Sequence, residues 1–374
     1  MTSNLQTDNP LAQEPLAASP HPALQASQPR PATAIVDEGG PLIIGVDLGG
    51  TKIFGALSDL KGHILKEMIL PTEAHEGRDP VLNRIERVIR EVMVGVDKSR
   101  ILGIGIGAPG PIDPFGGILY SPPNLPGMDA VPIRDIINDR LKLPVVIAND
   151  ANAAAVGEYV FGTPHTTRQG YGPQQPVRHM IYLTISTGIG GGIIIDGRLF
   201  VGSKGMGAEV GHMTVEANGL RCKCGNFGCV EVMASGTAIA RQGAELVRAG
   251  HAPILSELAE MQSERVTARL VQEAAMRGEP ESQELIARAG FYIGVAMTNL
   301  IHLFQPEMFV IGGGVSHIGE MLLGPIRQTI SERAIPQIRS GVEIVAASLG
   351  DRVGVMGALA IVLQEFPTKV GGGA

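Results

Sequence analysis

The three cysteines of this chain all fall within eight residues, at Cys222, Cys224 and Cys229. A histidine, His212, stands ten positions before the first of them. Three thiolates and one imidazole suit tetrahedral Zn²⁺, and the intervening glycines let the backbone turn tightly enough for the ligands to face one ion. Because four protein ligands fill the coordination sphere, we expect a structural zinc site and not a catalytic one.

The alternative for these cysteines is one disulfide and a free third thiol. Cys222 and Cys224 are separated by a single residue and are poorly placed to bridge each other. An odd number of cysteines gathered on one metal also suits a reducing compartment. We therefore favour zinc over a disulfide and expect a cytoplasmic location.

Length and composition restrict the class of protein. With 374 residues, 44% of them hydrophobic, the chain can bury two ordinary cores. Its net charge of −7 and the lack of a long basic run argue against a surface for nucleic acid. No apolar stretch reaches the roughly 18 residues of a membrane-spanning helix. Fifty glycines without a collagen period indicate tight loops where the backbone approaches another group closely.

Residues 1–41 are expected to be a disordered tail outside any core. Prolines interrupt every potential helix there, and the residues between them offer little to bury; they are Pro10, Pro15, Pro20, Pro22, Pro29, Pro31 and Pro41. The tail has neither the basic start nor the unbroken apolar core of a signal peptide. It also lacks the three periodic helices that a winged-helix DNA-binding domain would need.

From residue 42 onward, apolar runs alternate with amphipathic segments, which is typical of an α/β protein. Strands are predicted at 42–46, 53–57, 63–70, 101–107, 145–148, 181–186, 192–195 and 308–311. Helices are predicted at 78–96, 132–141, 151–161, 232–248, 281–304 and 318–333, with a last helix from 353 and a loop at 162–178. Each half of the chain therefore begins with a strand, a glycine turn and a second strand.

The two glycine turns are candidates for binding a polyphosphate. Glycines expose successive backbone N–H groups that can cup a phosphate. A single turn of this kind is more often an ordinary hairpin, but the pair together favours phosphate binding. The residues concerned are Asp47, Gly49, Gly50, Thr51 and Lys52 in the first turn, and Thr187, Gly188 and Gly190 in the second. Asp47 is placed to hold Mg²⁺ directly or through water. A third turn, with Gly313 and Gly314, follows a strand where an adenosine is expected to lie.

Two other nucleotide-binding motifs are excluded by spacing. The chain contains no G-x-x-x-x-G-K-[ST] sequence, so it is not a P-loop enzyme. Residues 105–110 fit G-x-G-x-x-G, but Pro109 and Pro111 forbid the helix that should receive a pyrophosphate. The prolines instead predict stiff loops at 108–114 and 122–127 that are suited to line a cleft.

Asp150 is the candidate catalytic residue. With Asn149 it stands between a buried strand and a helix, the position at the carboxyl end of a strand where α/β proteins gather their chemistry. Helix capping is the structural alternative for both residues. Glu209 lies three residues before His212, and Glu231 two after Cys229, so folding of the metal loop brings carboxylates and an imidazole together. Such groups suit a polyhydroxy ligand, and His212 has a second nitrogen to donate to it.

These motifs together resemble the ROK family of bacterial sugar kinases and sugar-responsive repressors. The resemblance is carried by residues 47–52, 107–110, 149–155, 207–212 and 222–231, and it covers nearly all of the chain from residue 42. The loop C-x-C-G-x-x-G-C-x-E is highly specific to this family. Within the family, the chain is most similar to ATP-dependent glucokinases. It departs from the repressors in its proline-rich tail, which stands where they carry a DNA-reading domain.

The resemblance implies an actin-like, two-domain ATPase fold in which sugar and ATP meet in a cleft. We expect a small α/β domain over 42–150, a large one over 151–352, and a helix at 353–366 that packs back on the small domain. The implied sugar contacts are Asn149, Asp150, Glu209, His212 and Glu231, with Gly110 nearby. Asp150 is expected to be the general base for the primary hydroxyl of the sugar, and zinc to support the loop that carries Glu231.

Several alternatives remain open at this stage. The same contacts suit glucose, fructose, mannose, N-acetylglucosamine or N-acetylmannosamine, and inorganic polyphosphate could occupy the glycine turns in place of ATP. A sugar-sensing regulator without catalysis is the second function class, and a dehydrogenase is a distant third. Related proteins usually self-associate, so a homodimer or homotetramer is expected.

Overall fold

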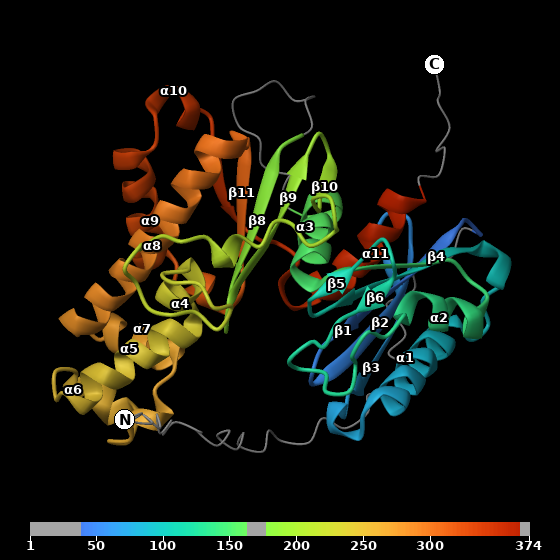
Figure 1. Ribbon diagram of the computed structural model, residues 1–374, viewed down its shortest axis with the longest axis horizontal. Helices are drawn as coiled ribbons and strands as arrows, with labels where there is room; N and C mark the ends of the chain where they lie inside the picture. Colours follow the sequence, from blue (N-terminus) through green and yellow to red (C-terminus); the bar gives the residue numbers. More distant parts are fainter. Residues whose placement is uncertain (1–38, 163–176, 367–374) are drawn as a thin grey trace, which may run out of the picture.

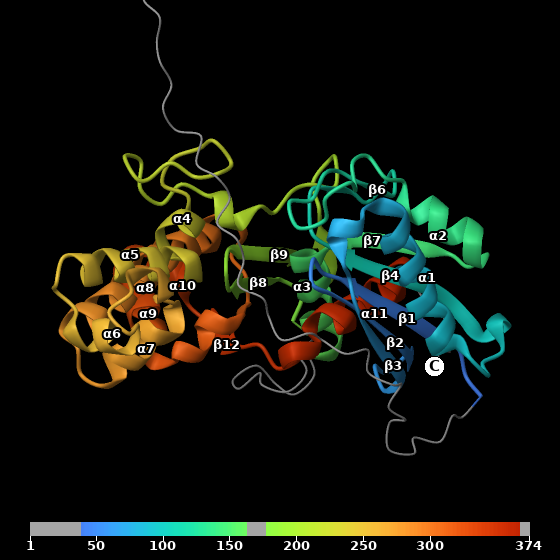
Figure 2. The same ribbon diagram turned by 90° about the horizontal axis from the view of Figure 1, so that it is seen from below.

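The computed structural model describes residues 39–162 and 177–366 and has two lobes, each built on a five-stranded mixed sheet (Figures 1 and 2). The predicted tail, apart from residues 39–41, and most of the predicted loop at 162–178 lie outside the described residues. Within the described residues, no helix combines the length and the apolar character that crossing a membrane requires.

The first lobe contains the sheet of strand order β3-β2-β1-β4-β7. Its strands are β1 (Leu42–Leu48), β2 (Lys52–Asp59), β3 (Ile64–Pro71), β4 (Ile101–Ala108) and β7 (Val145–Asn149). The first three pair antiparallel, and β4 and β7 run parallel to β1. Helices α1 (Arg78–Met93) and α2 (Ile133–Leu141) accompany this sheet, together with the small hairpin of β5 (Ile112–Asp113) and β6 (Ile118–Leu119).

Both faces of strand β1 are buried, and its side chains alternate between two cores. Leu42, Ile44, Val46 and Leu48 pack in the core that includes the buried face of α1. Ile43 packs on the opposite side, against α11 (Val353–Glu365). Gly45 also faces α11, because a Cβ there would stand 2.7 Å from the carbonyl oxygen of Val355. The last helix of the chain therefore covers the face of the first sheet from which Asp47 projects.

The second lobe contains the sheet of strand order β10-β9-β8-β11-β12. Its strands are β8 (Met180–Ile185), β9 (Ile189–Ile195), β10 (Arg198–Phe200), β11 (Met308–Gly312) and β12 (Glu343–Ala346). Helix α3 (Asp150–Phe161) packs on one face, where Met180 and Tyr182 are buried with its alanines. The other face packs on helices drawn from α4 (Val230–Ala234), α5 (Gly236–Arg248), α6 (Pro253–Leu258), α7 (Ala268–Met276), α8 (Pro280–Phe304), α9 (Glu320–Arg333) and α10 (Pro336–Arg339).

Helices α3 and α11 cross between the lobes (Figure 1). They touch through glycines, since a Cβ on Gly157 would stand 2.7 Å from the backbone nitrogen of Gly357. Next to this crossing, the fully buried Glu158 accepts hydrogen bonds from the backbone N–H groups of Ser348 and Leu349, at 2.9 Å each. The chain that leads into α11 is therefore fixed to α3 by a buried carboxylate.

Most predicted elements are present, with differences at their ends. The predicted helix at 232–248 is divided, because Ser235 is extended and its hydroxyl caps α5 by accepting from Ala238 N. Strand β9 begins at Ile189, so the second glycine turn is shorter than predicted and Gly190 lies in the strand. Helix α1 ends at Met93, and α9 begins at Glu320 after a 3-10 turn. Helices α6 and α7 and strands β10 and β12 were not predicted.

Candidate active site

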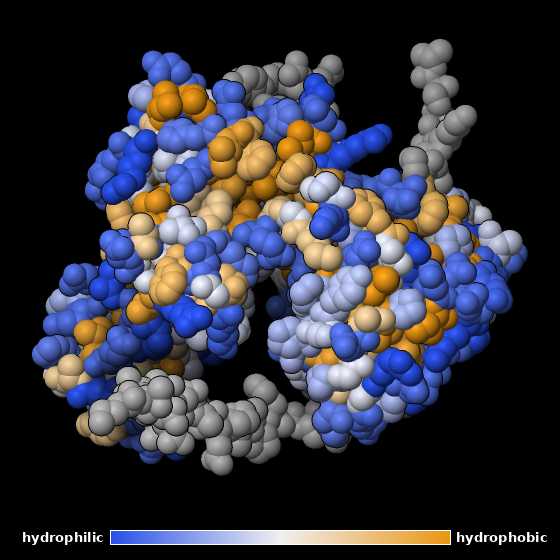
Figure 3. All heavy atoms as spheres, in the orientation of Figure 1, coloured by the Kyte–Doolittle hydropathy of each residue, from blue (hydrophilic) through white to orange (hydrophobic). Residues whose placement is uncertain are grey.

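A cavity of about 580 Å³ lies between the two lobes. The hollow between the lobes is visible in Figure 3, rimmed mostly by hydrophilic residues. The first lobe and the start of α3 contribute Asp47, Asn124, Asn149 and Asp150 to its wall, and the second lobe contributes Thr187, Gly188, Glu209, His212 and Glu231. The predicted catalytic residue, four of the other predicted sugar contacts and part of the predicted nucleotide site, from distant parts of the sequence, therefore meet in one cleft.

Asp150 is the first residue of α3 and follows directly on β7. The cap of this helix is Asn149, whose side-chain oxygen accepts from Ala151 N at 3.0 Å and Asn152 N at 3.3 Å. Asp150 is therefore not needed as the cap, although its carboxylate also accepts from Ala151 N at 2.7 Å. The side chain of Asp150 is exposed to the cavity, yet desolvation by the surrounding protein raises its pKa, against the lowering effect of these hydrogen bonds.

Asp47, at the end of β1, is a second carboxylate in the same cavity. Burial raises its pKa from 3.8 to about 6, the charge of Lys52 opposes this rise, and the charge of Asp150 adds to it. The Lys52 ammonium lies over the Phe54 ring, 5.9 Å from its centroid. Lys52 balances the negative charge of Asp47 only in part, and Asp150 adds a second negative charge nearby. A carboxylate in such surroundings is suited to bind a cation.

The first glycine turn lies beside the cavity. Gly49 N donates to Lys52 O at 2.9 Å, and the Thr72 hydroxyl donates to Gly49 O at 2.7 Å. A Cβ on Gly50 would stand 2.8 Å from the carbonyl oxygen of Asn124, a residue of the cavity wall. Asn124 was not named as a site residue, but it lies in the loop 122–127, which was predicted to line a cleft. Thr51, at the tip of the turn, is exposed.

The second glycine turn, Ser186–Gly188, separates this cavity from a neighbouring one of about 630 Å³. Ser186 and Thr187 line both cavities. The neighbouring cavity is otherwise lined by α5, α7 and the turn after β11, including Gly236, Thr237, Val266, Arg269, Gln272, Gly314 and His317. Gly314, which was expected to lie near an adenosine, is in the wall of this cavity. Gly313 packs closely against the end of β8, because a Cβ on Gly313 would stand 2.4 Å from the carbonyl oxygen of Ile185.

Glu209, His212 and Glu231 form the polar wall of the second lobe. Partial desolvation raises the pKa of Glu209, the nearby His212 lowers it, and the charges of Asp150 and Glu231 raise it further. The carboxylate of Glu231 accepts a hydrogen bond from Ile189 N at 3.1 Å, so it also contacts the second turn. Gly110, expected near the sugar, lies against the side chain of Asn149, where its Cβ would be 3.1 Å from Nδ2.

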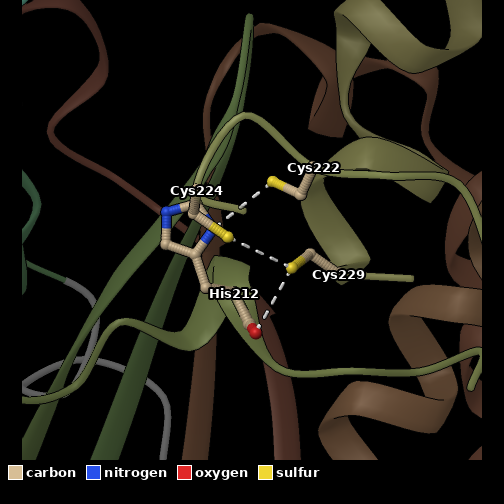
Figure 4. Close-up of side chains that lie close together, drawn as sticks. All are labelled: His212, Cys222, Cys224 and Cys229. Carbon is tan, nitrogen blue, oxygen red and sulfur yellow. Dashed lines mark hydrogen bonds between the residues drawn. The ribbon is translucent and has the colours of Figure 1, made fainter. Parts of the chain in front are cut away.

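The four predicted metal ligands point toward one another (Figure 4). Their ligand atoms all lie within 4.8 Å of one another. The Sγ atoms of Cys224 and Cys229 are 3.7 Å apart, and Cys222 Sγ is 3.7 Å from His212 Nδ1. Zinc–ligand distances of about 2.0 to 2.3 Å in a tetrahedron give ligand separations of about 3.5 to 3.8 Å, so the set fits Zn²⁺.

All three cysteines are free, which excludes the disulfide alternative in this structure. The loop is shaped by its backbone: Cys222 N donates to Asn226 O at 2.7 Å, and Gly225 N donates to Cys222 O at 3.0 Å. The backbone N–H of Asn226 is also the main cause of a lowered pKa at Cys224, which favours the thiolate. Gly228 has a positive φ of 59°, and a Cβ there would clash with Glu216 O, so the turn before Cys229 requires glycine.

Comparison with known proteins agrees with this arrangement. The chain belongs to the ROK family, whose signature matches residues 43–365. The glucokinase of Thermotoga maritima is 37% identical over 324 residues, which cover 87% of this chain and 98% of that enzyme. The xylose repressor of Caldicellulosiruptor bescii is 34% identical over 339 residues, which cover 90% of this chain and 82% of the repressor.

A solved structure extends the similarity to three dimensions. The ROK family glucokinase from Streptomyces griseus, in complex with glucose and AMPPNP, matches with a TM-score of 0.69 at 35% identity, covering 86% of this chain and 99% of that one. The chain therefore has the actin-like, two-lobed α/β fold of ROK sugar kinases, as its motifs predicted.

Proposed function

We propose that this protein is an ATP-dependent kinase that phosphorylates the 6-hydroxyl of glucose. The observation that carries the proposal is the position of Asp150, which shares one cavity with the polar wall of Glu209, His212 and Glu231 and with the turn Ser186–Gly188. A sugar held against that wall presents a hydroxyl to Asp150, and a phosphate chain on the turn approaches from the second lobe. The similarity to glucokinases supports glucose as the acceptor.

In this mechanism, Asp150 accepts the proton of the primary hydroxyl as the oxygen attacks the γ-phosphorus, a general-base role worth about 10²- to 10⁴-fold in rate. Its raised pKa brings the carboxylate closer to the range where such a base is effective. Asn149, Glu209, His212 and Glu231 orient the sugar. Closure of the two lobes about α3 and α11 excludes water, which would otherwise accept the phosphate.

Mg²⁺ bound with ATP would be held by Asp47, and it would neutralise charge on the phosphates. Carboxylate oxygen is the ligand type that Mg²⁺ prefers, and the pKa of about 6 at Asp47 indicates a carboxylate that a cation stabilises. Gly49 to Lys52 and Thr187, Gly188 and Gly190 are proposed to surround the phosphates. The cavity of about 630 Å³ beside Gly314 is proposed to receive the adenosine.

Zn²⁺ held by His212 Nδ1 and the three cysteines would supply folding free energy to the loop and take no part in the chemistry. With Nδ1 on the metal, Nε2 of His212 stays available to a sugar hydroxyl. We further infer a cytoplasmic enzyme of sugar metabolism that forms a homodimer or homotetramer. Exposed apolar side chains on the second lobe, at Phe291, Leu303 and Ile335, support self-association, and light scattering on the purified protein tests it.

The decisive experiment is an ADP-release assay across a panel of hexoses with ATP, GTP and inorganic polyphosphate as donors. Glucose with ATP is expected to give the highest kcat/KM, with mannose, fructose and the N-acetylhexosamines below it. Faster turnover of another hexose would replace glucose as the substrate. Absence of turnover with every hexose would favour the second candidate, a sugar-binding regulator, for which the similarity to xylose repressors is the supporting observation.

A further inference from the structure

The first residues of α5 donate hydrogen bonds to the backbone carbonyl groups of the turn Ser186–Gly188. Gly236 N donates to Ser186 O at 2.7 Å, and Thr237 donates to Thr187 O through both its backbone nitrogen, at 3.3 Å, and its hydroxyl, at 2.8 Å. In a trans peptide the carbonyl and the following N–H point in opposite directions. Because two carbonyls of the turn point to α5, the N–H groups of Thr187 and Gly188 point away from it, on the side suited to a phosphate.

Glu231 contacts the same turn from the metal loop. Its Oε2 accepts from Ile189 N at 3.1 Å, and the space it occupies exists because residue 188 is glycine: a Cβ there would stand 2.4 Å from that oxygen. Position 236 has the same requirement, since a Cβ on Gly236 would stand 2.7 Å from Ser186 O. A side chain at position 236 would therefore displace the backbone of the turn, and one at position 188 would displace the Glu231 carboxylate.

The segment 231–237 is short and continuous with the metal loop. Cys229 is the N-cap residue of α4. Ser235 N donates to Glu231 O at 3.1 Å at the end of this five-residue helix, directly before α5. A single residue, Val230, separates Cys229, the last metal ligand, from Glu231. A displacement of Cys229 would therefore also displace Glu231 and its contact with the turn.

We propose that residues 231–237 form a positioning bracket that sets the phosphate turn for the nucleotide, and that the metal loop fixes this bracket. The inference rests on the proposed function in taking the turn as a nucleotide-binding element. Thr237 is a positioning residue within it, acting through Thr187. The metal loop then serves both substrates, the sugar through His212 and the nucleotide through Glu231 and Thr237.

The test measures hydrogen exchange of the backbone amides at 187–189 in the protein without ligands, together with the Kd of a non-hydrolysable ATP analogue. Thr237→Val removes the hydroxyl donor and is expected to speed exchange and weaken nucleotide binding by about three- to tenfold, the effect of one lost hydrogen bond. The Kd of glucose should change by less than about twofold. Thr237→Ser, which keeps the hydroxyl, should restore both values.

The matched control is Thr329→Val. It removes the same type of bond, from a threonine hydroxyl to a backbone carbonyl at 2.8 Å, but on α9. It should leave exchange at 187–189 at the wild-type rate. Equal exchange and equal nucleotide Kd in Thr237→Val and Thr329→Val would overturn the role of Thr237.

A second arm removes the metal with a chelator and restores it with Zn²⁺. Chelation is expected to speed exchange at 187–189 and to weaken binding of the ATP analogue, and zinc should reverse both. Loss of sugar binding with unchanged exchange and nucleotide Kd would overturn the link between the metal loop and the turn. Neither measurement needs turnover, so failure of this inference is distinct from failure of the hexose assay.

Discussion

Gly354, the second residue of α11, lies against the carboxylate of Asp47: a Cβ at position 354 would stand 2.4 Å from Asp47 Oδ2. The contact follows from the alternation of β1, which directs Ile43, Gly45 and Asp47 to the face covered by α11. The position of this cleft carboxylate therefore depends on a helix from the far end of the chain.

Replacing Gly354 by alanine should displace the Asp47 carboxylate. We expect kcat/KM for ATP to fall about 10- to 100-fold, because misplacement by about 1 Å can cost that much. Steady-state kinetics with varied Mg²⁺ would measure the loss. The control is a double-mutant cycle with Asp47→Asn: if Gly354 acts through Asp47, the alanine should cost much less in that background. Additive losses would contradict the relationship.

Asp150→Asn should lower kcat by about 10²- to 10⁴-fold while glucose binding persists. Because the raised pKa of Asp150 must be exceeded for it to act as a base, wild-type kcat/KM should fall as pH drops through that pKa, above the ordinary 3.8. The residual activity of the variant should lack the part of this acid limb that Asp150 contributes and keep the part that the titration of Asp47 adds. A pH–rate profile and a binding titration check both points.

The control for that variant is Asp139→Asn, which makes the same chemical change on the exposed surface of α2. It should keep wild-type turnover. Turnover of Asp150→Asn within about tenfold of wild type would remove Asp150 from the role of base.

The sequence predicted those parts of the site that depend on local signals. Spacing of ligands along one loop identified the metal cluster, and the strand–turn–strand pattern located the turn at Gly49 and Gly50. Asp150 was found because a strand end and a helix start meet there. In each case, neighbours in the sequence are also neighbours in space.

The parts that were missed depend on contacts between distant segments. The prolines predicted that the loop 122–127 lines a cleft, but only its packing on Gly50 shows that Asn124 is the residue that reaches the cavity wall. Asp351 and Gly354 enter the wall because α11 returns to the first sheet, and no local pattern marks these two residues. The break at Ser235 was missed for the same reason: α4 and α5 form one apolar pattern, and the break allows Gly236 to reach Ser186 O.

Asp47→Asn should stabilise the protein without ligands at neutral and alkaline pH. Folding raises the pKa of Asp47 from 3.8 to about 6, so the folded state binds this proton more tightly and wild-type stability falls as pH rises through that window. At about pH 8 we expect the variant to gain about 1 to 2 kcal/mol, less than the full shift because of solvent screening. At about pH 4 the two proteins should be alike.

Urea unfolding of both proteins across this pH range measures the difference. Adding Mg²⁺ and ATP should stabilise wild type more than the variant, since only wild type offers the carboxylate. A stability difference that does not change between the two pH values would show that Asp47 is not desolvated in the folded protein.

Glu158→Ala should destabilise the protein by about 2 to 4 kcal/mol, because it empties the fully buried space of the Glu158 side chain and leaves the backbone N–H groups of Ser348 and Leu349 without this acceptor. Glu158→Gln retains an acceptor oxygen and should cost less. Among the residues that the structure describes, the exposed Glu332 accepts a hydrogen bond only from the side chain of Gln328. Glu332→Ala is therefore the control and should stay within about 0.5 kcal/mol of wild type. Urea unfolding measures all three.

Activity should fall with this loss of stability, because the segment that Glu158 holds leads directly to Asp351 and Gly354 in the cavity wall. We expect the Michaelis constant for ATP to rise in Glu158→Ala even at temperatures where the variant is fully folded, since loosening of Gly354 frees Asp47. Wild-type stability in Glu158→Ala would mean that the loop before α11 is fixed by other contacts. Lower stability with an unchanged Michaelis constant for ATP would show that Glu158 stabilises the fold but does not position Asp47.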